Sequence, residues 1–144
     1  MSRLIYLDNA ATTKTAPEVV DAMIPYFTEH YGNPSSVYSF ASGNKEVVSR
    51  QREIIAQALG AQANEIYFTA GGSESDNWAL KATAEAYEKK GKHIITTKIE
   101  HHAILHTCEY LEKQRGFEIT YLDVDENGVV DLDQLQKAIT PETI

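Results

Sequence analysis

The sequence has little that would place it outside an ordinary cytoplasmic setting. It holds a single cysteine, Cys108, so it cannot form an internal disulfide. It contains no apolar run near the ~20 residues that a membrane-spanning helix requires. Its first residues show neither the basic-then-apolar pattern of a signal peptide nor a cleavage site. We therefore expect a cytoplasmic chain with no membrane partner.

Basic residues are also few. The 13 Lys and Arg side chains are outnumbered by 21 Asp and Glu, which gives a formal net charge of -8. Nucleic-acid binding depends on clustered Lys and Arg that neutralise phosphates, and the sequence has no long run of them. We expect no nucleic-acid partner. With 42% hydrophobic residues, the 144-residue chain can bury the core of one domain.

The apolar spacing predicts an α/β fold. Two amphipathic helices are expected first, at residues 17–30 and 43–59, with Gly60 ending the second. Strands and helices then alternate. The expected strands are 65–69, 93–97 and 117–123, and the expected helices are 73–89, 102–115 and 132–138, the last capped by Asp131 with Gln134. Because a helix connects each strand to the next, the three strands should lie parallel.

Ligands of open α/β sheets gather beyond the carboxyl ends of the strands, which directs attention to the loop after Thr69. There Gly71-Gly72-Ser73 opens a helix, and Ser73 is expected to cap it together with Asp76. Glycines let the backbone approach a ligand, and a helix start favours an anion such as phosphate. The alternative is a common helix-start turn, with nearby carboxylates satisfying the dipole.

Histidines mark the loop after the next strand. His102 and His106 stand four residues apart on a predicted helix and could share a zinc ion, but no third ligand is evident. The pattern favours solvated helix residues and no metal site. His101, at the strand end, is a titratable ring that can stack on an aromatic cofactor or move protons.

Two other features are interpreted as structural. Asp123, Asp125 and Asn127 have the spacing of a calcium loop, but Gln134 stands where a bidentate carboxylate is required, and a strand precedes the loop instead of a helix. Cys108 lies among apolar residues at helical spacing and has no basic neighbour that would lower its pKa, so we expect it in the core.

Taken together, four motifs resemble the NifS- and IscS-like cysteine desulfurases of the class V aminotransferase family. They occur in the family's order along essentially the whole chain. The motifs are Tyr6-Leu7-Asp8-Asn9-Ala10-Ala11-Thr12-Thr13, Tyr31-Gly32-Asn33-Pro34-Ser35-Ser36, Phe68-Thr69-Ala70-Gly71-Gly72-Ser73-Glu74-Ser75-Asp76-Asn77 and Glu100-His101. The chain differs in three places from residues that are frequent in the family. It has Tyr38 where His is frequent, Ala41 where Gly is frequent, and Gly72-Ser73 where Ala-Thr is frequent.

The resemblance implies a fold and a site. Residues 15–144 would be the N-terminal part of the large domain of a fold-type I, aspartate aminotransferase-like enzyme, which binds pyridoxal 5'-phosphate (PLP). Residues 1–14 would lie near the substrate entrance. The resemblance assigns Gly72 and Ser73 to the PLP phosphate, and His101 to the ring face and to proton transfer. It assigns Asn9, Ala10, Ala11 and Thr12 to the substrate, and residues 33–36 to the site's rim or a dimer interface.

The resemblance also implies an activity. Family members remove sulfur from L-cysteine, giving alanine and an enzyme persulfide that serves iron-sulfur cluster or thio-cofactor assembly through an acceptor or scaffold protein. The Ser-x-His-Lys lysine and the mobile-loop cysteine are not among these residues. We therefore expect the chain alone to be inactive, and to need a C-terminal portion or a complementary chain within a homodimer. The alternatives are another class V enzyme, such as a selenocysteine lyase, and an inert phosphate-binding module.

Overall fold

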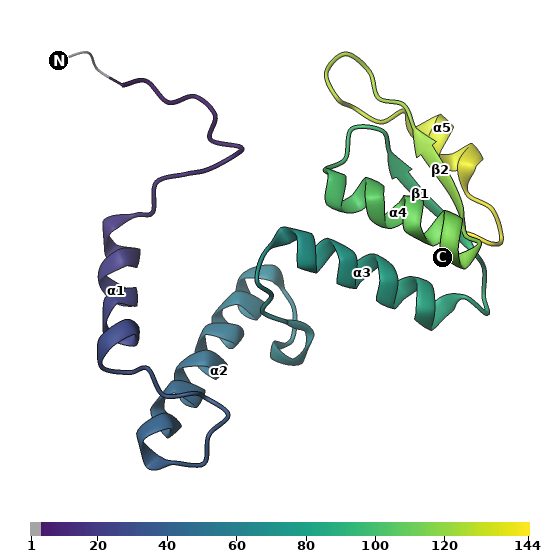
Figure 1. The fold of residues 1–144 in the computed structure, drawn as a ribbon. Helices are drawn as coiled ribbons and strands as arrows, with labels where there is room; N and C mark the ends of the chain where they lie inside the picture. The colour runs from purple at the N-terminus through teal and green to yellow at the C-terminus, as the bar shows by residue number, and fades with distance from the viewer. Residues whose placement is uncertain (1–3) are drawn as a thin grey trace. The chain divides into compact units, whose positions relative to one another are not determined.

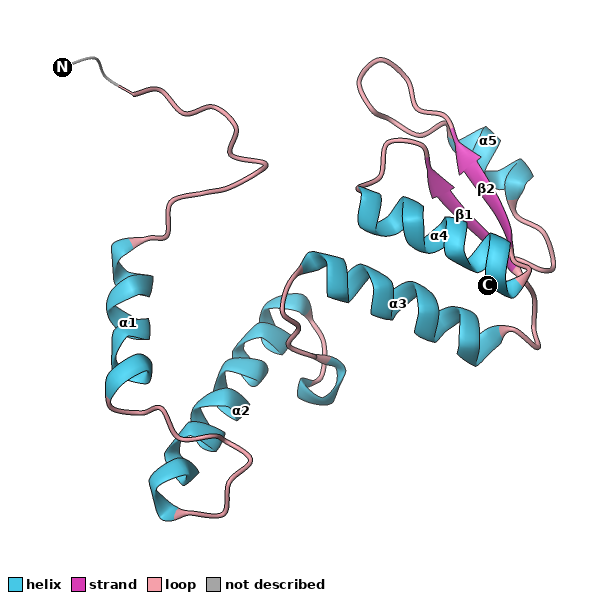
Figure 2. Ribbon diagram, in the orientation of Figure 1, coloured by secondary structure: helices cyan, strands magenta, loops and turns pink. Residues whose placement is uncertain are grey.

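The computed structural model describes residues 4–144, which form two separate units (Figures 1 and 2). The first unit ends at Tyr67 and the second comprises Phe68–Ile144. The boundary that we expect after residue 14 does not coincide with this division, and it stays a prediction. The elements are α1 (Pro17–Thr28), α2 (Ser39–Leu59), the 3-10 turn η1 (Ala63–Glu65), α3 (Gly72–Tyr87), β1 (His93–Thr97), α4 (His102–Arg115), β2 (Glu118–Leu122) and α5 (Leu132–Ala138).

The first unit holds the two expected helices. Pro17 occupies the first turn of α1, where its missing N–H costs nothing. Helix α2 begins at Ser39, earlier than expected, because Gly43 is accommodated inside the helix. It ends at Gly60, whose φ of 67° is the left-handed conformation that glycine adopts without strain. The unit buries little, since only Ala41 and Ala56 of these helices are buried.

The loop between α1 and α2 is tied to the start of α2. The side-chain amide of Asn44 donates to the carbonyl oxygens of His30 and Gly32, both at 2.6 Å. Gly32 packs so closely on α2 that an added Cβ would lie 3.0 Å from Cα and Cβ of Ala41. Ala41 is itself fully buried. The small residue at position 41 and the glycine at position 32 therefore permit one close contact.

The strand expected at residues 65–69 is wrong. Residues 63–65 form η1, closed by a hydrogen bond from the Gln62 amide to Oε2 of Glu65 at 2.7 Å. Ile66 is extended, with φ -100° and ψ 123°, but no strand pairs with residues 65–69 in the described part of the chain. A strand requires a neighbour to complete its ladder, and local propensity alone does not provide one.

The second unit is an α/β layer, as expected. Strands β1 and β2 are parallel, with His93 opposite Glu118 and Thr97 opposite Leu122, and α4 is the crossover between them (Figure 1). The bounds of α4 are those predicted, and Gly116, with φ 69°, ends the helix in the left-handed conformation. The parallel sheet with a crossover helix is confirmed for these two strands.

The core of the second unit lies between α3, α4 and the sheet. Its buried members are Ala84, Cys108, Leu111, Phe117 and Ile119, and the side chains packed against them include Leu80, Ile94, Ile104, Tyr121 and Ile144. Cys108 is fully buried, as expected. Burial raises the pKa of its thiol, and the nearby carboxylates of Glu100 and Glu112 act in the same direction.

The last residues pair with the free edge of β1. The His93 amide donates to the Glu142 carbonyl oxygen, and the Ile144 amide donates to the His93 carbonyl oxygen, both at 3.0 Å. The His93 ring is 3% exposed, and hydroxyls satisfy both of its nitrogens, Thr143 at 2.7 Å and Thr120 at 2.8 Å. Residues 142–144 therefore extend the sheet on the side opposite β2.

The segment after β2 is a hydrogen-bonded turn. The Asp125 carboxylate accepts from the amides of Asn127 and Val129, and Gly128 has φ 80°. Oδ1 of Asp125 is thus engaged by two backbone donors, and the element before the turn is the expected strand. Asp131 caps α5 by accepting from the amides of Asp133 and Gln134, which confirms its expected role. Within residues 4–144, no helix combines the length and the apolarity needed to cross a membrane.

Candidate functional site

The start of α3 differs in detail from the expectation. The N-cap residue is Gly71, not Ser73, so Ser73 is already the second residue of the helix. The expected cap between Ser73 and Asp76 is therefore wrong. The carboxylate of Glu74 reaches back instead and accepts from the Ala70 amide at 2.6 Å. That bond holds the loop before the helix, and α3 begins at Gly72, one residue earlier than predicted.

This start leaves two amides without an acceptor. The N–H groups of Gly72 and Ser73 form no hydrogen bond to any residue in the described range, whereas the amides of Glu74 and Ser75 reach the Gly71 carbonyl. The space beside them is open, because a Cβ added at Gly71 or Gly72 would meet no atom within 4 Å. Two free donors at the positive end of a 16-residue helix can accept an anion.

Neighbouring bonds fix the loop at this helix start. The hydroxyl of Thr69 lies 2.7 Å from that of Ser75 and donates to the Gly71 carbonyl at 3.2 Å. The side chain of Asn77 donates to the Ser73 carbonyl at 2.9 Å. No side-chain contact engages the Ser73 hydroxyl within residues 4–144, so it remains available as a third donor beside the two amides.

His101 occupies the N-cap of α4. Its Nδ1 atom accepts from the Ala103 amide at 3.1 Å, and it lies at the carboxyl end of β1, where the sequence predicts a ligand-facing ring. Two contacts hold the preceding loop: Thr97 donates its hydroxyl proton to Glu100 at 3.0 Å, and the Lys98 ammonium pairs with the Asp123 carboxylate at 2.7 Å.

The structure brings Ser73 and His101 together. Both line one open groove of about 450 Å³ between α3 and α4. Its other lining residues are Asn77, Lys81, His102, Ala103, His106, Thr107 and Tyr110. None carries a carboxylate, whereas the lining includes the ammonium of Lys81 and several hydroxyls and amides. Such a lining suits an anionic ligand. The sequence singled out Ser73 and the histidines of this groove but not Lys81 or Tyr110, whose positions follow only from the packing of the two helices.

The N-terminal residues that the resemblance assigns to the substrate belong to the first unit. Residues 8–12 form a turn in which the amides of Ala11 and Thr12 donate to the Asp8 carbonyl. The Thr12 hydroxyl also lies 2.6 Å from the Tyr6 hydroxyl. The role of Asn9, Ala10, Ala11 and Thr12 at the substrate stays a prediction.

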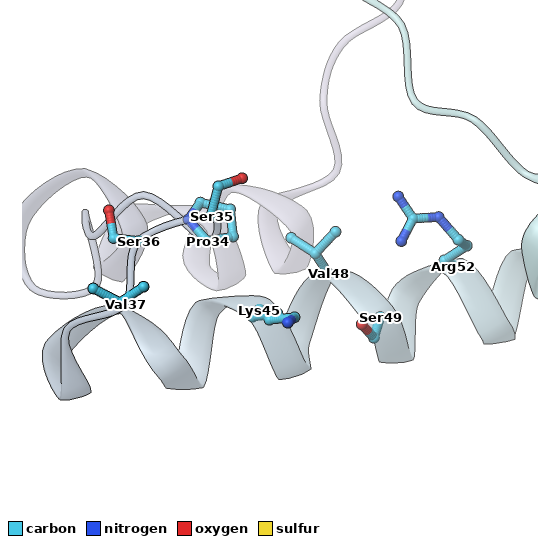
Figure 3. Close-up of a pocket in the computed structure, with 8 residues that line it drawn as sticks. All are labelled: Pro34, Ser35, Ser36, Val37, Lys45, Val48, Ser49 and Arg52. Atoms are coloured by element: carbon cyan, nitrogen blue, oxygen red, sulfur yellow. The ribbon is translucent and has the colours of Figure 1, made fainter.

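A second groove, of about 740 Å³, lies in the first unit between the residue 34–37 loop and α2 (Figure 3). Lys45, Val48, Ser49 and Arg52 line it from successive turns of the helix, and the loop closes its other side. The Nε atom of Arg52 also donates to the Ile66 carbonyl at 3.1 Å. The sequence analysis missed these helix residues, although their spacing of three and four places them on one face.

Comparison with known families gives one clear match. The class V aminotransferase family matches residues 5–144. The chain is 58% identical over 144 residues to the cysteine desulfurase IscS of Clostridium botulinum (strain Kyoto / Type A2), covering 100% of this chain and 36% of that relative. It is 56% identical over 143 residues to the cysteine desulfurase IscS of Methanosarcina thermophila, covering 99% of this chain and 35% of that relative. The chain thus spans about a third of the length of these relatives.

Solved structures agree with the sequence relatives. A NifS-like protein superposes with a TM-score of 0.91 at 41% identity, covering 97% of this chain and 38% of that one. SspA in complex with cysteine superposes with a TM-score of 0.88 at 40% identity, covering 96% of this chain and 40% of that one. At these identities the likeness extends beyond the fold.

Proposed function

Because the chain belongs to the class V aminotransferase family, we propose that it supplies the cofactor-anchoring part of a PLP-dependent cysteine desulfurase. One observation carries the proposal: Ser73, at the start of α3 where two amides are free, shares a carboxylate-free groove with the His101 ring. The names of the relatives support the activity, and the SspA structure, which contains cysteine, supports L-cysteine as the substrate.

The donor set fits a phosphate monoester. The amides of Gly72 and Ser73 and the Ser73 hydroxyl can each donate to a phosphate oxygen, and the helix dipole favours its negative charge. Glycine at position 72 keeps the approach clear of a side chain. When bound, PLP supplies the electron sink that makes bond cleavage in the substrate possible. The residues of this chain anchor and orient it.

His101 serves the ring of the cofactor. Nδ1 of His101 accepts a hydrogen bond from the Ala103 amide. A neutral His101 therefore carries its proton on Nε2, and this nitrogen remains available to contact a ligand. An imidazole ring held at the helix start can lie against the cofactor's ring, and its Nε2 proton can be donated to a nearby substrate atom. The Thr97–Glu100 and Lys98–Asp123 contacts hold the loop that carries it.

The groups that form covalent bonds would come from outside these residues. No lysine here follows Ser-x-His, and Cys108 is buried in the core, away from any ligand. The complete enzyme would convert L-cysteine to alanine, hold the sulfur as a cysteine persulfide and pass it to an acceptor protein for iron-sulfur cluster or thio-cofactor assembly. We propose that it works as a cytoplasmic homodimer, with residues 15–144 in the large domain and residues 9–12 near the substrate.

A chimera tests the function. The 144 residues replace the matched segment of the Clostridium botulinum relative, and alanine released from L-cysteine is measured with PLP present. We expect alanine formation within about tenfold of the unaltered relative, because 58% of the exchanged residues are identical. A folded chimera that binds PLP but forms alanine only from selenocysteine would indicate a lyase of that substrate. A folded chimera that retains phosphate compounds without turnover would indicate an inert module.

A further inference from the structure

Two histidines of α4 lie in contact on its exposed surface, and both border the groove that Ser73 and His101 line. The ring centroids of His102 and His106 are 5.3 Å apart, with 25° between the ring planes. Both side chains are exposed, as the sequence predicts for solvated helix residues. Residues four apart stand one above the other on a helix, so two imidazoles at this spacing can bind a single ion.

The third neighbouring histidine does not complete the set. The ring centroids of His101 and His102 are 6.1 Å apart. Nδ1 of His101 accepts a hydrogen bond from the Ala103 amide, so the proton of a neutral His101 lies on Nε2. Within residues 4–144, no group of three or more His, Cys, Asp or Glu side chains is arranged to hold a metal. A bound ion would take two nitrogens from the protein and its remaining ligands from water.

Charges of both signs lie around the pair, and the ammonium of Lys81 lines one groove together with both histidines. His102 and His106 line a shallow groove that also includes Lys98, Glu109, Glu112 and Lys113. Both lysines are neutralised, Lys98 by Asp123 and Lys113 by Glu109. Glu112 forms no ion pair with any described residue, so it contributes net negative charge at the rim.

We propose that His102 and His106 form a two-histidine surface site for one divalent transition-metal ion, of the class that prefers imidazole: Cu²⁺, Ni²⁺ or Zn²⁺. Small rotations of the two exposed side chains bring one nitrogen of each to the ~2.1 Å that metal–imidazole bonds require. Oxygen-preferring Mg²⁺ and Ca²⁺ would not compete. The site does not depend on the proposed desulfurase activity, and an ion there would link the first two turns of α4.

The proposal is tested by isothermal titration of the chain with Ni²⁺ at neutral pH. We expect one ion per chain, an affinity unchanged by millimolar Mg²⁺, and binding at least tenfold weaker after either His102→Gln or His106→Gln, because each variant removes one of two ligands. His30→Gln is the matched control, since it removes an exposed histidine of the other unit and should leave the affinity unchanged. Equal affinity in all three variants would overturn the site.

A double variant that restores two histidines four residues apart keeps the test decisive if a single variant changes the fold. His102→Gln combined with Tyr110→His places a new pair, four residues apart, one turn further along the same exposed surface. Recovery of Ni²⁺ affinity to within a fewfold of the unaltered chain supports chelation by two imidazoles at this spacing. Failure to recover, with an unchanged far-ultraviolet circular dichroism spectrum, contradicts it.

Discussion

The Nδ1 atom of His101 accepts a hydrogen bond from the backbone amide of Ala103 at 3.1 Å, so this side chain caps α4. The same ring lines the groove that Ser73 borders. One side chain therefore has two separable properties: an acceptor that completes the helix start, and a flat ring that lines the groove. Substitutions can remove either property alone.

The first prediction separates these properties in the chimera with the Clostridium botulinum relative. His101→Asn keeps a capping acceptor and loses the ring, so PLP affinity should fall while thermal stability is retained. His101→Phe keeps a ring and loses the cap, so stability should fall by about 1 kcal/mol with a smaller loss of affinity. Absorption titration with PLP and thermal unfolding give the two values. Equal PLP affinity in all variants would remove His101 from the site.

The second prediction concerns the Ser73 hydroxyl. Ser73→Ala removes one charge-assisted hydrogen bond to phosphate, worth about 1.5–3 kcal/mol, so PLP affinity should fall at least tenfold. Affinity for pyridoxal, which lacks the phosphate, should not change. Ser49→Ala, which removes a serine hydroxyl from the other unit's groove, is the control. A matching loss of pyridoxal affinity would show that Ser73 acts on the ring and not on the phosphate.

The third prediction concerns Gly91, which lies against the final residues. A Cβ at this position would be 2.1 Å from the Glu142 carbonyl oxygen, a clash with backbone that cannot rotate away. Gly91→Ala should displace residues 142–144 from β1 and lower stability by roughly 1–3 kcal/mol. Urea unfolding measures the loss. Gly43→Ala, where a Cβ meets nothing within 4 Å, should not destabilise the chain.

The fourth prediction concerns Cys108. Because burial raises the pKa of its thiol, little thiolate forms near pH 8, and the sulfur is also inaccessible. Iodoacetamide should modify the native chain at least a hundredfold more slowly than the urea-unfolded chain, as followed by mass spectrometry. Rapid alkylation of the native chain would show that Cys108 is not held in the core.

The fifth prediction concerns pH and the turn after β2. Hydrogen bonds from the amides of Val129 and Asn127 lower the pKa of Asp125. The carboxylate therefore stabilises the turn fully above its ordinary pKa, and the effect is lost as pH falls through the lowered value. Nuclear magnetic resonance shifts of the two amides should follow this titration. In Asp125→Asn they should not titrate, and an unchanged profile there would contradict the assignment.

The sequence predicts those elements whose ends carry their own signals. Gly116 caps the end of α4 and Asp131 caps the start of α5, so each helix has the expected bounds. The strand at residues 65–69 is wrong because its hydrogen bonds depend on a neighbour that propensity does not reveal. The cap assigned to Ser73 is wrong for another reason: Glu74 competes for the loop before the helix by accepting from Ala70.

The candidate site is predictable to a similar extent. The sequence identifies Gly71, Gly72 and His101 as candidate ligand-binding residues because they stand in loops that follow predicted strands. The meeting of Ser73 and His101 in one groove depends on how α3 packs on α4, and the sequence does not specify that packing. Lys81 and Tyr110 enter the groove for the same reason, and the ammonium of Lys81 lies 5.0 Å from the centre of the Tyr110 ring.

The central claim is that the start of α3 and the His101 ring hold PLP. A crystal structure of the PLP-bound chimera tests it most directly. The account predicts phosphate oxygens within about 3.2 Å of the Gly72 amide, the Ser73 amide and the Ser73 hydroxyl, with the His101 ring lying face-on against the cofactor. A phosphate bound away from the start of α3, or a cofactor ring with no contact to His101, would contradict it.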